Sequence, residues 1–158
     1  MQPAVIASTQ PSLSIVIPVY GRWQAARVLA ALQPLEALEI LVCDSSPVPT
    51  PLPDLPGVRL IHLKQRAFPG AARNAGWQQS RGDYVLFVDA DVVLTTDAHQ
   101  FVRRHMQSGV RDMAFGLYTS DCPDYNSISR FVVTIQRHRF EQEFARNHFR
   151  YGQSSHVL

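Results

Sequence analysis

Short, almost continuously apolar segments are the feature that most constrains the fold of this chain. Residues 13–19 read Leu-Ser-Ile-Val-Ile-Pro-Val, and residues 39–43 and 84–88 have the same character. Apolar runs of this length are typical of strands that are buried on both faces of a parallel sheet. Residues 58–63 are predicted to form a further strand.

The segments that follow these strands have apolar residues at helical spacing. Helices are predicted from residue 25 to the stop at Pro34, over residues 72–79, and after a cap at Thr95 or Thr96 as far as His105. A further strand is predicted over residues 111–118. A long amphipathic helix is predicted from Asn126, with its apolar positions at Ile128, Phe131, Val132 and Ile135. Strands that alternate with helices predict an α/β fold with a Rossmann-like, mostly parallel sheet flanked by helices, in which ligands bind at the carboxyl ends of the strands.

The domain organisation follows from length and composition. A chain of 158 residues with 46% apolar residues can bury one core, so we expect a tail over residues 1–11 and a single domain over residues 12–158. Residues 47–57 contain five prolines and are predicted to be an extended connection. The net charge is only +2, with no long basic run, which argues against a nucleic-acid partner.

Cysteine spacing and hydropathy indicate the cellular compartment of the protein. Cys43 and Cys122 match neither a zinc site nor a disulfide framework, which favours a reducing environment. No signal peptide or spanning segment is recognised, so a cytoplasmic location is predicted. The arginine-rich stretch over residues 137–150 is interpreted as a solvated helix face, an anionic membrane contact or an acceptor-phosphate site, which leaves peripheral membrane contact open.

Two aspartates follow the strand predicted over residues 84–88. Asp89 and Asp91 are separated only by Ala90, so the end of that strand brings two hard oxygen ligands near one point. Carboxylate oxygens suit Mg²⁺ or Mn²⁺. By itself the pattern is common, and a cap or a turn explains it equally well.

The surroundings of these aspartates resemble the central block of family 2 glycosyltransferases. Residues 68–77 read Phe-Pro-Gly-Ala-Ala-Arg-Asn-Ala-Gly-Trp, and residues 81–91 continue the block through Asp-Ala-Asp. Residues 14–20 and 39–44 are similar to the opening and second strands of that family. The resemblance implies a GT-A fold and a domain that binds a nucleotide sugar.

The resemblance also implies roles for particular positions. The implied nucleotide-sugar-binding residues are Pro18, Val19, Tyr20, Asp44, Arg73, Asp89, Ala90 and Asp91. The first three would line the base and ribose, Asp44 would recognise the base, and Arg73 would lie near the diphosphate or sugar. Asp89 and Asp91 would bind Mn²⁺ or Mg²⁺. The structural alternatives are strand termination at Pro18, an Asx-turn at Asp44 and an exposed helix charge at Arg73.

The implied activity is inverting transfer of a sugar from a nucleoside-diphosphate sugar to a hydroxyl of a glycan or lipid-linked acceptor. Many family members have an acidic residue where this chain has Ser45, so uridine specificity is in doubt. Family 2 domains normally continue beyond the region matched here, so the general base and much of the acceptor pocket are expected to be absent, and no catalytic residue is assigned. Asp121 and Asp124 are explained by turns.

Two other functions stay open from the sequence. The chain could be a noncatalytic, nucleotide-binding fragment or degenerate domain. Residues 89–94 also resemble the Asp-x-Asp-x-Val-Leu motif of haloacid-dehalogenase-like phosphatases, in which the first carboxylate is a nucleophile. In those phosphatases the motif usually follows the first strand.

Overall fold

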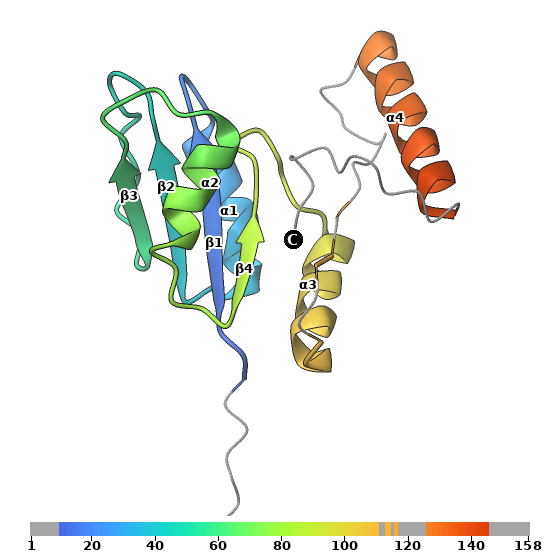
Figure 1. The fold of residues 1–158 in the computed structure, drawn as a ribbon, viewed down its shortest axis with the longest axis horizontal. Helices are drawn as coiled ribbons and strands as arrows, with labels where there is room; N and C mark the ends of the chain where they lie inside the picture. Colours follow the sequence, from blue (N-terminus) through green and yellow to red (C-terminus); the bar gives the residue numbers. More distant parts are fainter. Residues whose placement is uncertain (1–9, 111–112, 115, 117–125, 146–158) are drawn as a thin grey trace, which may run out of the picture.

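A four-stranded, all-parallel sheet forms the centre of the chain, in the order β3-β2-β1-β4 (Figure 1). The computed structural model describes residues 10–110, 113, 114, 116 and 126–145. The strands are β1 (Leu13–Val19), β2 (Glu39–Asp44), β3 (Val58–His62) and β4 (Tyr84–Phe87). The helices are α1 (Ala25–Leu32), the short 3₁₀ helix η1 (Gln33–Leu35), α2 (Pro69–Trp77), α3 (Thr96–Ser108) and α4 (Ser127–Ala145).

Strand β1 lies at the centre of this sheet and is buried along its whole length. It pairs with β2 from Ser14 opposite Glu39 to Val19 opposite Asp44. On its other side it pairs with β4, from Leu13 opposite Tyr84. The α/β class and the parallel sheet predicted from the sequence are therefore confirmed.

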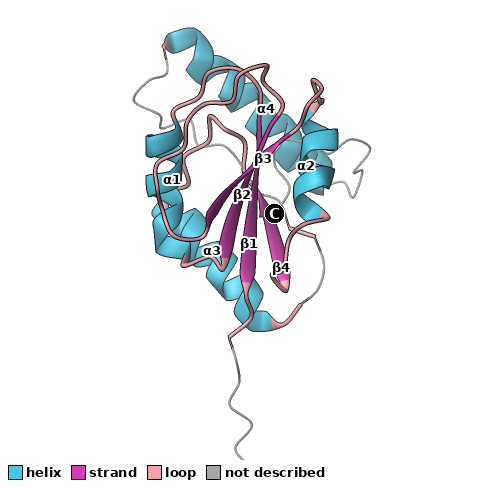
Figure 2. Cartoon of the chain, turned by 90° about the vertical axis from the view of Figure 1, so that its left-hand side faces the viewer, coloured by secondary structure: helices cyan, strands magenta, loops and turns pink. Residues whose placement is uncertain are grey.

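Helices α1 and α2 cover opposite faces of the sheet (Figure 2). Helix α1 leads from β1 to β2, whereas α2 leads from β3 across to β4 on the far side of β1. Because crossovers between parallel strands are right-handed, connections that run in opposite directions place their helices on opposite faces. The strand order therefore reverses between β1 and β4, and ligands of open α/β sheets bind at such a point.

The two faces carry separate apolar cores. On one face, alternate residues of β1 pack with α1, and this cluster includes Ile15, Ile17 and Leu29. On the other face, Val16 and Cys43 pack with α2. A Cβ at Gly76 of α2 would lie 2.4 Å from Val16 Cγ1, so the absence of a side chain lets helix and sheet approach closely. Burial raises the pKa of the free Cys43 thiol to about 11.

A buried carboxylate joins the amino ends of β1 and β2. Glu39 is 1% exposed, and its Oε1 accepts hydrogen bonds from Ser14 Oγ (2.9 Å) and from the Arg81 backbone N–H (2.7 Å). The guanidinium groups of Arg59 and Arg81 contact its Oε2. Burial raises the pKa of this carboxyl, but the hydrogen bonds from Ser14, Arg81 and Arg59 more than offset that effect and hold the pKa below its ordinary value of 4.5.

Several predicted boundaries shift in the structure. Strand β2 extends to Asp44 because that residue still pairs with Val19, so Asp44 lies within the strand and not in the following loop. Strand β4 ends at Phe87, one residue earlier than predicted. Helix α2 begins at Pro69, since proline suits the first turn of a helix, and ends before Gln79.

The region after α3 matches its prediction less well. Thr95 does cap α3, and its Oγ1 accepts from Ala98 N (3.3 Å). Met113, Ala114 and Gly116 lie in no strand, and the rest of the strand predicted over residues 111–118 lies outside the described residues. The long helix from Asn126 is confirmed as α4, but Ile128, Phe131, Val132 and Ile135 are exposed and Val133 is buried instead. None of the described helices is long and apolar enough to span a membrane.

Candidate functional site

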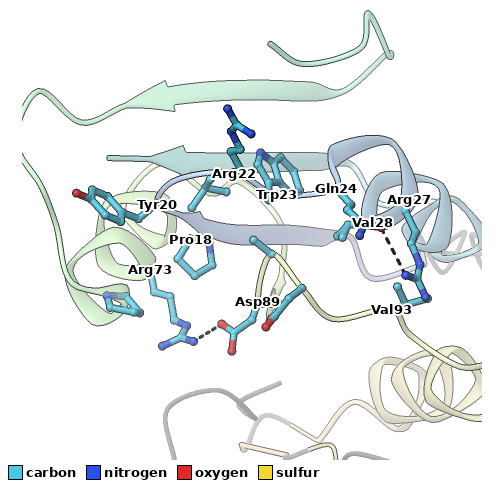
Figure 3. A pocket seen from close by; sticks show the side chains of 14 residues that line it. Pro18, Tyr20, Arg22, Trp23, Gln24, Arg27, Val28, Arg73, Asp89 and Val93 are labelled. Atoms are coloured by element: carbon cyan, nitrogen blue, oxygen red, sulfur yellow. Dashed lines mark hydrogen bonds and ion pairs between the residues drawn. The ribbon is translucent and has the colours of Figure 1, made fainter. Parts of the chain in front are cut away.

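A cavity of about 530 Å³ lies at the carboxyl ends of β1 and β4, where the strand order reverses. Its wall comes from the end of β1, the start of α1, helix α2 and the loop after β4 (Figure 3). The lining residues are Pro18, Val19, Tyr20, Arg22, Trp23, Gln24, Arg27, Val28, Pro69, Arg73, Asp89, Ala90, Asp91 and Val93. The cavity therefore lies at the position that the topology favours for a ligand.

The cavity brings together almost all of the residues predicted as a site. Those that line it are Pro18, Val19, Tyr20, Arg73, Asp89, Ala90 and Asp91. Asp44 is the exception, since it does not line the cavity. Residues from three separate chain segments thus converge on one space, as the carboxyl-end rule for parallel sheets predicts.

An ion pair between Arg73 and Asp89 forms the polar centre of the cavity. Figure 3 shows the Arg73 side chain reaching from α2 toward the carboxylate of Asp89, and Arg73 Nη2 donates a hydrogen bond to Asp89 Oδ1. The side chain of Arg73 is only 9% exposed, and that of Asp89 is 20% exposed. Arg73 Nε is buried and has no hydrogen-bond partner in the described part of the chain. A buried donor of this kind is costly unless something else satisfies it.

The donor set at this edge suits a metal ion only if a ligand completes the coordination. Asp89 is half-buried and Asp91 is exposed on the same turn, in which Val92 N donates to Asp89 O (3.0 Å). Across the described residues, no three His, Cys, Asp or Glu side chains gather closely enough to hold an ion. Mg²⁺ is commonly bound by one or two carboxylates together with phosphate oxygens and water. An ion at this turn would therefore need oxygens from a ligand and from water to complete its coordination.

Tyr20 provides an aromatic surface in the lining of the cavity. Its side chain is 51% exposed, and the guanidinium carbon of Arg66 lies 4.5 Å from its ring centroid. This distance is typical of a cation–π contact. Arg66, in the loop before α2, thus lies against an aromatic ring.

Asp44 is engaged by the backbone of its own loop. Its Oδ1 accepts from Ser46 N (2.7 Å) and its Oδ2 accepts from Thr50 N (3.2 Å), while the residue is fully buried. This arrangement is the Asx-turn that the sequence left open as an alternative. The neighbouring Ser45 Oγ lies within hydrogen-bond distance of Val19 O and Ala67 O, each at 3.4 Å.

The start of α1 supplies lining residues that sequence reasoning missed. The lining residues that were not predicted are Arg22, Trp23, Gln24, Arg27, Val28, Pro69 and Val93. Trp23 Nε1 is buried and, within the described part of the chain, has no hydrogen-bond partner. These residues at the start of α1 could have been predicted from their place in the sequence, directly after the first strand. The turn after a central parallel strand lies at the same edge of the sheet as the strand's carboxyl end.

Comparison with known proteins identifies the family. The sequence matches Glycosyl transferase family 2 over residues 14–156, which is most of the chain. A search of curated proteins found no match. The Asp-Ala-Asp segment follows β4 and not the first strand, in contrast to the usual position of the phosphatase motif. The fold, the arrangement of the site and the match over residues 14–156 agree, and the chain belongs to glycosyl transferase family 2.

Proposed function

We propose that the cavity binds the nucleoside diphosphate portion of a nucleotide-sugar donor. The observation that carries this proposal is the ion pair of Arg73 with Asp89, adjacent to Asp91, at the reversal point of the sheet. The guanidinium presents fixed donors that match phosphate oxygens, and the unpartnered Nε leaves one of them unused by the described protein groups.

Each lining segment has a proposed role. The ring of Tyr20 would stack on the nucleobase, and Pro18 and Val19 would contact the base and ribose. Arg73 would hold the diphosphate, and the Asp89-Asp91 turn would hold a Mn²⁺ or Mg²⁺ ion shared with it. Such an ion, when bound, supplies positive charge next to the departing nucleoside diphosphate.

We further propose that the reaction is an inverting displacement at the anomeric carbon by a hydroxyl of a glycan or a lipid-linked acceptor. The protein groups around the diphosphate favour this step electrostatically, because negative charge grows on the leaving group. A general base must also lie within hydrogen-bond reach of the acceptor hydroxyl, and we assign no residue to that role. The cytoplasmic location and the peripheral membrane contact stay predictions.

Calorimetry tests the donor site directly. UDP, GDP, ADP and dTDP would be titrated into the protein with and without Mn²⁺, and at least one is expected to bind more tightly with the ion. Asp91→Ala should remove the metal-dependent part of that affinity. Asp54→Ala is the matched control, because Asp54 is exposed in the proline-rich connection and does not line the cavity. Absence of binding by all four nucleotides, with the fold intact, would contradict the proposal.

Turnover is a separate measurement. Release of nucleoside diphosphate from a panel of nucleotide sugars, with and without simple acceptors, reports transfer or hydrolysis. Binding without any turnover would favour the noncatalytic alternative and leave the donor site in place.

A further inference from the structure

The backbone on both sides of Tyr20 is held by two consecutive residues of the loop after β2. The carbonyl oxygen of Val19 accepts a hydrogen bond from Ser45 N (3.0 Å). The N–H of Gly21 donates to Ser46 Oγ (2.7 Å). Both peptide groups next to Tyr20 are therefore fixed to the same short segment.

Asp44 determines where that segment lies. Its two carboxylate oxygens accept from the backbone N–H groups of Ser46 and Thr50, which turns the loop back toward β1. The carbonyl oxygen of Ser46 lies 3.0 Å from His62 Nε2, which ties the segment to the end of β3 as well. Asp44 and Ser46 are both buried, and neither lines the cavity.

The chain also makes a sharp turn immediately after Tyr20. Gly21 has φ +84°, a backbone angle that residues other than glycine rarely adopt. A Cβ at this position would meet nothing within 4 Å. Glycine is therefore needed for the backbone angle and not for space. With Tyr20 half-exposed, the direction of its ring depends on the two backbone hydrogen bonds, on this turn and on the Arg66 guanidinium, which lies 4.5 Å from the ring centroid.

We infer that Asp44 and Ser46 are positioning residues that hold the Tyr20 backbone so that its ring is ready to stack on a nucleobase. Asp44 itself does not select among bases, because both of its oxygens are engaged and it lies outside the cavity. This inference rests on the proposed function and assigns to Asp44 a role different from the base contact that the family resemblance implies.

Substitution of Ser46 tests the inference with ligands. Ser46→Ala removes the acceptor for Gly21 N–H, so affinities for UDP, GDP and ADP should all fall by the same factor, about fivefold for one hydrogen bond. Inorganic pyrophosphate, which has no base, should bind as tightly as before. Ser46→Thr keeps a hydroxyl and should restore nucleotide affinity. Ser108→Ala, which removes an exposed hydroxyl at the end of α3, is the control.

Asp44→Asn separates a positioning role from base recognition. The amide retains the volume of the carboxylate but cannot accept from both Ser46 N and Thr50 N. We expect a uniform loss for every base and an unchanged affinity for pyrophosphate. A change in the ratio of UDP to GDP affinity, with the melting temperature preserved, would overturn the inference.

Hydrogen exchange of the Gly21 amide provides a readout that needs no ligand. This amide should exchange slowly in the parent protein and in Ser46→Thr, and faster in Ser46→Ala and Asp44→Asn. If no nucleotide binds the parent protein, the proposed function fails, whereas the exchange rates still decide whether the backbone is held as inferred. Equal exchange in Ser46→Ala and the parent would refute the role of Ser46.

Discussion

The two ends of the parallel sheet each carry an arginine–carboxylate contact. In only one of them is the hydrogen-bonding capacity of the buried group fully used. At the amino end, Glu39 is almost completely buried and receives hydrogen bonds from Ser14, Arg59 and Arg81 on both oxygens. At the carboxyl end, Asp89 is partly exposed in a cavity, and Arg73 retains a buried Nε without a partner among the described residues.

This difference separates a structural charge site from a candidate binding site. A buried carboxylate whose acceptors are all satisfied stabilises the fold and has little capacity left for a ligand. A buried guanidinium with an unused donor retains that capacity, and its cost to stability is offset when an anion binds. Unused hydrogen-bonding capacity is therefore a better guide to function here than the presence of an ion pair.

Removal of the carboxylate at the amino end should have the largest effect on stability. Glu39→Gln places a neutral amide against Ser14 and two arginines, and we expect the free energy of unfolding to fall by about 2–3 kcal/mol, less than for a fully buried pair because both arginines are partly exposed. Urea denaturation followed by circular dichroism measures this loss. Glu36→Gln, at an exposed position, should stay within about 0.5 kcal/mol of the parent. A comparable loss in both variants would remove the contrast between the two ends.

Replacement of glycine by alanine should also be tolerated differently at the two ends of the sheet. A Cβ at Gly82 would lie 2.5 Å from Ser14 N and 2.8 Å from Leu13 C, both backbone atoms. Gly82→Ala should therefore lower the free energy of unfolding by about 1–3 kcal/mol. At Gly70, where α2 begins near the cavity, a Cβ would meet nothing within 4 Å, so Gly70→Ala should be neutral or stabilising by up to about 1 kcal/mol. Thermal melts of the two variants measure the difference.

Substitution at the carboxyl end should change binding more than stability. Arg73→Lys keeps the positive charge but loses the planar set of donors, so affinity for the best nucleoside diphosphate should fall about tenfold, or about 1.4 kcal/mol. Calorimetry measures this change, and Arg104→Lys on the exposed side of α3 should leave affinity unchanged. Undiminished affinity in Arg73→Lys would place the diphosphate elsewhere.

The smallest expected effect is a pH dependence that arises from the amino end. Because the pKa of folded Glu39 lies below its ordinary value of 4.5, the ionised carboxylate stabilises the fold above that value, and this contribution is lost as the pH falls through and below it. Denaturation midpoints followed from neutral pH to well below pH 4.5 should therefore decline more steeply for the parent than for Glu39→Gln. Parallel declines would show that Glu39 titrates alike in the folded and unfolded chains.

The strands were predictable because their signals are local. Residues 13–19 and 84–88 are short apolar runs, the first closely followed by Gly21 and the second directly by Asp89, and their positions in the sheet follow from topological rules. Convergence of Tyr20, Arg73 and Asp89 on one edge followed from the same rules together with the family resemblance.

The remaining features depend on contacts between distant segments. The partners of Glu39 lie 20 to 42 residues away, and no local pattern indicates that Arg59 and Arg81 reach it. The hydrogen bond that Asp44 Oδ2 accepts from Thr50 N depends on the path of the loop after β2. Periodicity alone identified the α4 helix correctly but could not tell which of its faces would be buried, and Val133 was found buried where Phe131 was expected.

The central position of β1 has a consequence for the order in which the protein forms. Strands β1, β2 and β3 are consecutive and neighbouring, whereas β4 must reach β1 across a separation of about 71 residues, from Leu13 to Tyr84. Contacts between distant residues carry a larger loop-closure cost and form slowly. A nascent chain can thus pair its first three strands before residues 84–91 leave the ribosome. Binding competence should then arise only when β4 docks, so ligand affinity would report the completion of folding.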